Sequence, residues 1–137
     1  MTKAQMREMT ESDYSALLRG SPVPIVVHGE DSRVVDANPA FAELFGYSMS
    51  EVLNLHAHDV IHPDDQAVRD HQAEQLLNQE HTTMNVARRL VRKDGSSVWA
   101  KVRKSSIKRP DGVVVMVFFE DWTDQHWDDP AKFDPDH

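Results

Sequence analysis

Apolar and polar residues alternate in the second half of the chain with a period of two, which is typical of β-strands. Three such runs lie between residues 82 and 122, separated by Lys93-Asp94-Gly95-Ser96 and Arg109-Pro110-Asp111-Gly112. Aspartate followed by glycine favours the tight turns that join antiparallel neighbours. The pattern therefore predicts three consecutive antiparallel strands.

The parity of these runs predicts which side chains face the core. The inward positions of the first two runs are Met84, Val86, Arg88, Leu90, Val98, Ala100 and Val102. The opposite face then carries Arg89, Lys93, Trp99, Lys101 and Arg103. Residues 113–119 are apolar on both parities, which indicates a strand that is covered on both sides.

The first half of the chain begins with a predicted helix and two strands. Thr10 or Ser12 can cap a helix over residues 10–20, which ends where a glycine and two prolines follow. Residues 25–28 and 33–37 have the composition of strands. The turn residues between these two segments predict a hairpin.

Three further helices are predicted between residues 38 and 77. Asn38 can cap the first, with a proline at its first position, and Ser48 forms a capping box with Glu51 in the second. The third begins at His62-Pro63, where two aspartates follow near the positive end of the helix dipole. Its inner side should hold Val68, His71, Gln72 and Leu76.

This order of elements predicts an α+β fold with a five-stranded antiparallel sheet and helices packed on one face. With 137 residues and 39% hydrophobic content, the chain can bury one core, so we expect a single domain. The predicted parts are a flexible N-terminus over residues 1–9, an N-terminal helix over 10–20, the folded domain over 21–124 and an acidic disordered tail over 125–137.

Three motifs within this order resemble a known family. They are residues 38–47, Ile61-His62-Pro63-Asp64-Asp65 and Arg92-Lys93-Asp94-Gly95. Together they resemble the PAS domain, and the similarity runs from about Tyr14 to Asp124. The resemblance implies a curved sheet that, with its helices, encloses a small cavity, which either binds a metabolite or cofactor or is filled by side chains. Many members of the family also dimerise through the outer sheet face and an N-terminal helix.

The end of the predicted domain is also similar to the family. Asp121-Trp122-Thr123 looks like the family's terminal aspartate-isoleucine-threonine signal with a tryptophan substituted. In multidomain relatives this signal leads into a helix that carries the conformational change to an effector domain. Here Asp128-Asp129-Pro130 and Asp134-Pro135-Asp136 follow, and prolines and like charges oppose such a helix. We therefore expect a separate effector protein, or output through the N-terminal helix and the outer sheet face.

Charge, cysteine content and the length of the apolar runs exclude several kinds of site and location for the protein. The formal net charge of −8 lies mostly in residues 120–137, which hold seven acids and one base. Cysteine is absent, which excludes disulfides, thiolate metal sites and a cysteine-linked flavin. The longest apolar run, residues 113–119, is too short to cross a bilayer, and the first residues contain no signal-peptide core. We expect no membrane contact and a cytoplasmic location.

The cavity that the resemblance implies should be bordered by apolar residues and one arginine. The candidates are Val27, Phe41, Phe45, Leu53, Leu76, Val86, Arg88, Val102 and Val117. A buried guanidinium needs a carboxylate or comparable partner. A ligand carboxylate or an internal acid such as Glu43 would supply it. A register slip that exposes Arg88 and buries Arg89 would remove the need for either.

The eight histidines raise the possibility of a metal or haem site. Zinc-type ligands gather in one segment, at His56, His58, Asp59, His62, Asp64 and Asp65. Because His62 starts a helix and the other two histidines precede it in a loop, we predict no metal site. His71 lies about one turn further along its helix than the iron ligand of the haem-binding relatives, so its register disfavours haem ligation. A non-covalent cofactor is not excluded, and its identity is unknown.

The outer face of the sheet should be basic and should carry an interface. Nine bases and the single acid Asp94 lie in the stretch from Arg88 to Arg109. No aromatic stacking array accompanies these bases, so we expect contacts with the acidic tail or with protein rather than with nucleic acid. Apolar area on the N-terminal helix and the sheet predicts a homodimer interface formed by Tyr14, Leu17, Leu18, Trp99 and Trp122.

These features predict a stand-alone PAS-type module of bacterial-type signalling that binds a small molecule in its core and signals through protein contacts. The sequence contains no nucleophile elbow or phosphate-binding loop, so we predict that it is not an enzyme. The alternative hypothesis is a ligand-free dimerisation adaptor. A haem-based gas sensor is the third hypothesis.

Overall fold

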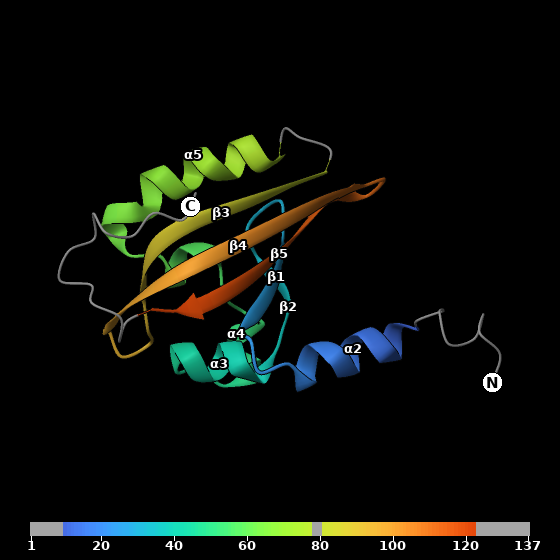
Figure 1. Cartoon of the computed structure of the whole chain (residues 1–137), viewed down its shortest axis with the longest axis horizontal. Coiled ribbons are helices and arrows are strands. Elements are labelled where there is room, and N and C mark those ends of the chain that lie inside the picture. Colours follow the sequence, from blue (N-terminus) through green and yellow to red (C-terminus); the bar gives the residue numbers. More distant parts are fainter. Residues whose placement is uncertain (1–9, 78–80, 123–137) are drawn as a thin grey trace.

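The computed structural model describes residues 10–77 and 81–122 (Figure 1). The order of its elements is helix, two strands, short helices and three strands, as the sequence predicts. The elements are α2 (Glu11–Gly20), β1 (Ile25–Gly29), β2 (Val34–Ala37), α3 (Pro39–Phe45), α4 (Met49–Val52), the 3-10 turns η1 (Ala57–Val60) and η2 (Pro63–Asp65), α5 (Gln66–Leu77), β3 (His81–Val91), β4 (Ser97–Arg109) and β5 (Gly112–Asp121).

The five strands of the described chain form one sheet in the order β2-β1-β5-β4-β3, and every neighbouring pair is antiparallel. The last strand, β5, therefore lies beside the first strand, β1, in the middle of the sheet. Both predicted aspartate-glycine turns are present, and Gly95 and Gly112 have φ values of 89° and 133° there. A glycine suits these positions because a Cβ atom is strained at positive φ. The predicted α+β class is confirmed.

The predicted helix starts are confirmed by their capping contacts. The Thr10 hydroxyl accepts from the Asp13 N–H at 3.1 Å, and the Asp13 carboxylate accepts from the Thr10 N–H at 3.0 Å. Ser48 and Glu51 form the same reciprocal box, at 3.2 and 2.9 Å. Each box satisfies two amide donors that a helix leaves without partners at its first turn.

Asn38 caps α3 and also ties that helix to β1. Its Oδ1 accepts from the N–H groups of Phe41 and Ile25, each at 3.0 Å, and its Nδ2 donates to the Val23 carbonyl at 2.7 Å. The side chain is completely buried. One polar residue therefore satisfies three backbone groups and fixes where α3 leaves the sheet.

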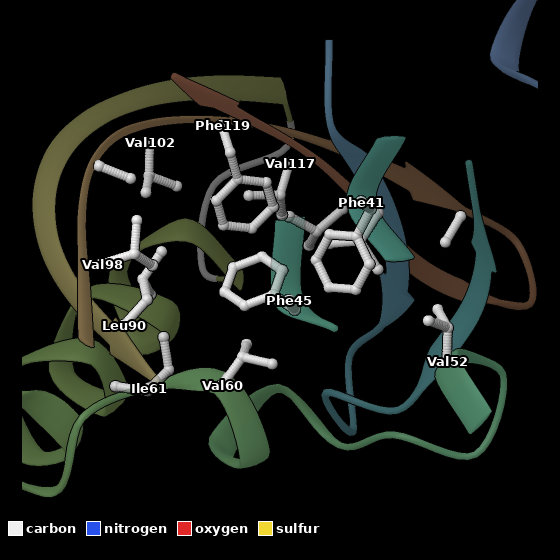
Figure 2. Packing of buried hydrophobic residues seen from close by; sticks show 14 of the residues in the cluster. Phe41, Phe45, Val52, Val60, Ile61, Leu90, Val98, Val102, Val117 and Phe119 are labelled. Carbon is white, nitrogen blue, oxygen red and sulfur yellow. The ribbon is translucent and has the colours of Figure 1, made fainter. Parts of the chain in front are cut away.

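Three phenylalanine rings form the centre of the core (Figure 2). The centroid of Phe41 lies 4.7 Å from that of Phe45, and each of these rings lies 5.5 Å from Phe119 on β5. Such tilted pairs contribute beyond the area that they bury. Through these rings, α3 packs on the inner face of the sheet, whereas α2 extends away from it and buries none of its residues (Figure 1).

The predicted inner side of α5 is wrong for Val68 and His71, whereas Gln72 is half-buried. Val68 and His71 are exposed, and the buried residue of this part of the helix is Arg69. The exposed fraction of Val68 is 53%. Apolar residues recur too rarely along α5 to form a continuous stripe, so the sequence pattern does not fix the rotation of the helix about its axis. The side chain of Leu76 lies outside the described residues.

The expectation that β5 is covered on both sides is also wrong for the described part of the chain. Val113, Val115, Val117 and Phe119 are buried on the inner face. On the outer face Val114 and Phe118 are half-buried, and Met116 is 38% exposed. The core therefore lies on one side of this strand, and its apolar outer side faces a surface.

Some predicted features lie outside the described residues. They are the flexible N-terminus over residues 1–9, the acidic tail over 125–137, and Thr123 at the end of the family-like signal. Within residues 10–77 and 81–122, none of the helices has the length and apolar character needed to cross a membrane.

Candidate functional site

A cavity of about 40 Å³ lies between the inner face of the sheet and the helical segments. A single water needs about 10–15 Å³, so the space exceeds that of one water molecule. The lining residues from the strands are Val26, His28, Val34, Arg88, Leu90, Val102, Lys104, Val117 and Phe119, and those from the helices and loops are Phe41, Leu55, His56, Ala57, Val60, Ile61 and Arg69.

The described residues that line the cavity include four buried basic side chains. His28, Arg69, Arg88 and Lys104 come from β1, α5, β3 and β4, and their exposed fractions are 7%, 3%, 4% and 6%. Lys104 pairs with Val117, which pairs with Val26 on β1, so the lysine lies on the same sheet face as His28. No aspartate or glutamate is among the described lining residues.

The two arginines differ in how their donors are used. Arg69 Nη2 donates to the Ser32 hydroxyl at 2.9 Å, and its Nη1 lies 3.5 Å from Asp70 Oδ1. Arg88 Nη1 donates to the Ala87 carbonyl at 3.2 Å. The Nε and Nη2 atoms of Arg88 are buried and have no hydrogen-bond partner among the residues that the structure describes. An always-charged guanidinium thus presents two unused donor atoms in a buried environment.

The pKa values of Lys104 and His28 both lie well below those of the free side chains. Burial, followed by repulsion from Arg69 and Arg88, lowers the pKa of Lys104 from 10.5 to about 7. Burial is also the main cause that lowers the pKa of His28 from 6.5 to about 4, against a raising contribution from its hydrogen bond to the Gly29 carbonyl. His28 is therefore neutral at pH 7, and Lys104 carries about half a charge there.

The family model of the PAS fold matches residues 12–122. The chain belongs to the PAS family. The match spans the whole described sheet, and it confirms the resemblance that residues 38–47 and the two later motifs carry. PAS domains are sensory modules, and this one is homologous to signalling proteins.

Two curated relatives are similar to this PAS domain. The Probable diguanylate cyclase DgcE of Escherichia coli (strain K12) is 24% identical over 80% of the chain, and the Sensor histidine kinase TmoS of Ectopseudomonas mendocina is 24% identical over 85%. The chain spans only 10% and 12% of the length of these relatives. The PAS domain of a protein from Colwellia psychrerythraea is a solved structure with a TM-score of 0.75, 17% identity, and coverage of 83% of this chain and 98% of its own.

The structure brings some of the predicted pocket residues of the PAS domain together and places others elsewhere. Phe41, Arg88, Val102 and Val117 line the cavity. Phe45 and Val86 belong to the surrounding core, and the side chain of Leu76 is not described. The positions predicted for Val27 and Leu53 are wrong, because Val27 points to the other sheet face from the lining residues Val26 and His28, and Leu53 is 49% exposed.

The sequence interpretation missed three of the four buried basic residues that line the cavity. Lys104 continues the buried alternation of Val98, Ala100 and Val102 on β4, so its inward position was available from parity. His28 and Arg69 carried no such signal, because four consecutive residues of β1 are buried and α5 lacks an apolar stripe.

The structure excludes the register slip and the pair with Glu43 as explanations for Arg88. The register slip is wrong, because Arg88 is buried whereas Arg89 is half-buried and donates to Asp64 at 3.0 Å. An internal pair with Glu43 is also wrong, since Glu43 is exposed on α3. The acid whose charge acts on Arg88 is Asp65, and the Asp65 carboxylate accepts from the Arg89 backbone N–H at 2.9 Å.

The histidine-rich segment serves as helix caps in this PAS domain. His56 Nδ1 accepts from the His58 N–H, and His62 Nδ1 accepts from the Asp64 N–H, each at 3.1 Å. Among the described residues, no three side chains of metal-binding type are grouped as ligands. His71 is exposed on α5 rather than directed at the core, so no feature of the described structure favours the haem hypothesis.

The predicted interface residues lie in two places. Tyr14 and Leu17 are 64% and 63% exposed on α2, and Leu18 is half-buried. Trp99 and Trp122 are half-buried on the outer face, where the backbone N–H of Trp122 donates to the backbone carbonyl of Trp99 at 2.8 Å. Basic side chains stack on both indoles, with Arg89 5.5 Å from Trp99 and Lys101 5.6 Å from Trp122.

Proposed function

We propose that this PAS domain is a non-catalytic cytoplasmic sensor that binds a small molecule in its core cavity and signals through contacts with a separate effector protein. The observation that carries the proposal is the cavity itself, which is lined by buried donors that the described protein groups leave unused. Ligand sites in proteins combine an apolar lining with a few convergent polar groups, as found here. The homology to a sensor histidine kinase supports the signalling part of the proposal.

Arg69 offers a route from the cavity to the surface of the domain. It extends from α5 and bonds to Ser32 in the turn between β1 and β2, so it links the helix to the hairpin across the cavity. A ligand that contacts this guanidinium changes the relative stability of arrangements in which α5 is close to or apart from the hairpin. The shift in population is limited by the difference in ligand affinity between those arrangements.

The binding part is tested by native mass spectrometry and by thermal melting with a metabolite panel. A ligand that binds only the folded state raises the melting temperature. Val117→Leu adds a methylene to the cavity wall and should abolish the shift. Val114→Leu adds the same group to the opposite face of β5 and is the matched control.

The outcomes of this screen are separable. A ligand in the core is supported if a compound raises the melting temperature of the wild type and of Val114→Leu but not that of Val117→Leu. A shift that both variants retain places the ligand elsewhere and contradicts the proposal, as does the absence of any retained mass or stabilising compound.

A specific observation favours one second function, a dimerisation adaptor. Helix α2 buries none of its residues, and it leaves Tyr14 and Leu17 exposed on its surface. Light scattering of Leu17→Arg tests this function, with Ser15→Arg on the same helix as the control. A dimer that dissociates only in Leu17→Arg supports the α2 interface, whereas a monomeric wild type rules it out.

A further inference from the structure

The four buried basic side chains at the cavity lie close enough together for their charges to interact. His28, Arg69, Arg88 and Lys104 line the same small space, although their positions in the sequence span residues 28–104. Arg69 and Arg88 both lower the pKa of Lys104, because their positive charges oppose its protonation. Like charges in a buried space repel, and burial strengthens that repulsion.

The nearby acids satisfy this cluster only in part. Asp70 lies 3.5 Å from Arg69, but it also accepts from His58 at 2.7 Å and is about half exposed. Asp65 acts on Arg88 at longer range, and Asp31 acts weakly on His28. Arg88 and Lys104 form no ion pair with any of the described residues.

The geometry of the unused donors indicates what fits between them. The Nε and Nη2 atoms of a guanidinium form one edge of a planar fork, which matches the two oxygens of a carboxylate in a pair of parallel hydrogen bonds. On Arg88 this edge is the part without a partner, while Nη1 is used by the Ala87 carbonyl. The apolar lining residues Phe41, Leu90 and Val117 suit a hydrocarbon substituent beside the charged group.

The size of the cavity narrows the ligand class further. At about 40 Å³, the space corresponds to roughly three to four water-sized positions. Carboxylates with one to three carbons, such as formate, acetate and propionate, are of this size. A phosphate ester of a metabolite is larger than this space.

We propose that the cavity binds a small monocarboxylate, with its two oxygens on Nε and Nη2 of Arg88, and that Lys104 takes up a proton when the anion enters. This inference rests on the proposed function of core ligand binding. Arg69 supplies a second positive charge from α5, and the alkyl part of the ligand contacts Phe41 and Val117. His28 stays neutral at pH 7 because burial lowers its pKa, and its Nδ1 lies 2.7 Å from the Gly29 carbonyl oxygen.

The primary test is isothermal calorimetry and thermal melting with sodium formate, acetate and propionate, at ionic strength matched with sodium chloride. Acetamide and ethanol serve as neutral probes of similar size. We expect at least one carboxylate to raise the melting temperature of the wild type and the neutral probes to have no effect. Arg88→Met should weaken binding at least about tenfold, and Arg88→Lys should restore only part of the affinity because lysine lacks the fork.

The matched control is Arg89→Met, which removes a neighbouring arginine from the outer side of the same strand. It should bind the carboxylate as the wild type does. Arg88→Met replaces an uncompensated buried cation by an apolar group and should therefore melt at least as high as the wild type without ligand. A loss of binding in this variant is then not a consequence of unfolding.

Calorimetry at pH 8 in buffers of different ionisation enthalpy tests the proton uptake. We expect the wild type to take up close to one proton per bound carboxylate and Lys104→Met to take up none. The charged or titratable groups that line the cavity together with Lys104 are His28, His56, Arg69 and Arg88. The arginines stay charged and the pKa of His28 is about 4, so these groups keep their protonation state at pH 8, and His28→Gln and His56→Gln should each leave the uptake unchanged.

Each outcome bears on a different proposal. The monocarboxylate site is overturned if the neutral probes bind in preference to carboxylates, or if Arg88→Met binds carboxylates as the wild type does. Either result leaves the proposal of a ligand-binding core unaffected. Carboxylate binding without proton uptake overturns the role of Lys104. If neither charged nor neutral compounds bind, and native mass spectrometry finds no retained ligand, the proposed sensor function fails together with the site.

Discussion

Replacement of Lys104 by methionine should remove a pH dependence from the stability of the protein. The folded-state pKa of this lysine is about 7, against 10.5 for an unperturbed side chain. Between these two values the unfolded chain binds a proton that the folded chain does not bind. Stability therefore rises with pH across this window, and it falls as pH decreases toward 7, where the buried amine becomes charged.

The magnitude follows from the two pKa values. One pH unit with a full proton difference changes the free energy of unfolding by about 1.4 kcal/mol. From pH 7 to pH 9 the folded lysine loses its remaining half proton, while the unfolded lysine stays protonated. The wild type should therefore gain about 2 kcal/mol over these two units, and Lys104→Met should gain none from this position.

The assay is urea unfolding followed by circular dichroism at pH 7, 8 and 9, in buffers of constant ionic strength that contain no carboxylate. Lys101→Met is the matched control, because Lys101 lies on the outer face of the same strand and stacks on Trp122. It should keep the slope of the wild type. Parallel pH profiles for the wild type and Lys104→Met would refute the reasoning, because the lysine would then titrate alike in both states.

Three further predictions concern the core, the α3 cap and the histidine. Phe45→Ala should cost about 4 kcal/mol in urea unfolding because the ring is fully buried, whereas Leu53→Ala, 49% exposed, should cost less than about 1 kcal/mol. Asn38→Ala should cost about 2–4 kcal/mol in the same assay, because three backbone groups lose their partner. The folded-state pKa of His28, about 4 against 6.5, should lower wild-type stability by about 1.5 kcal/mol between pH 6.5 and 5, and His28→Gln should lack this decrease.

Local chemistry made the elements predictable from the sequence. Capping boxes and aspartate-glycine turns depend on side chains within three or four residues of one another, so the starts of α2, α3 and α4 and both aspartate-glycine turns followed from short motifs. The parity of β4 was also predictable, since this strand is buried on one face only. These features sufficed for the order of the elements and for the class of the fold.

The cavity was predictable only in part, because the orientation of a side chain depends on packing. Ile25, Val26, Val27 and His28 are all buried, so no alternation in β1 showed which residues face the cavity. In the four-residue helix α4, Val52 is fully buried. Successive helical residues point about 100° apart, which directs the next residue, Leu53, outward. The apolar character of Val52 and Leu53 alone therefore did not show which of the two is buried.

A buried cluster of cations is a poor way to stabilise a protein, and this is why it indicates a function. An uncompensated charge in a core costs free energy, and an apolar residue of similar size removes that cost. Arg88→Met and Lys104→Met should therefore stabilise the ligand-free protein at pH 7 while they weaken carboxylate binding. If these residues instead served the structure through described contacts, both substitutions would destabilise the ligand-free protein. The two explanations predict changes of opposite sign for the same substitutions, so a single measurement of unfolding free energy without ligand distinguishes them.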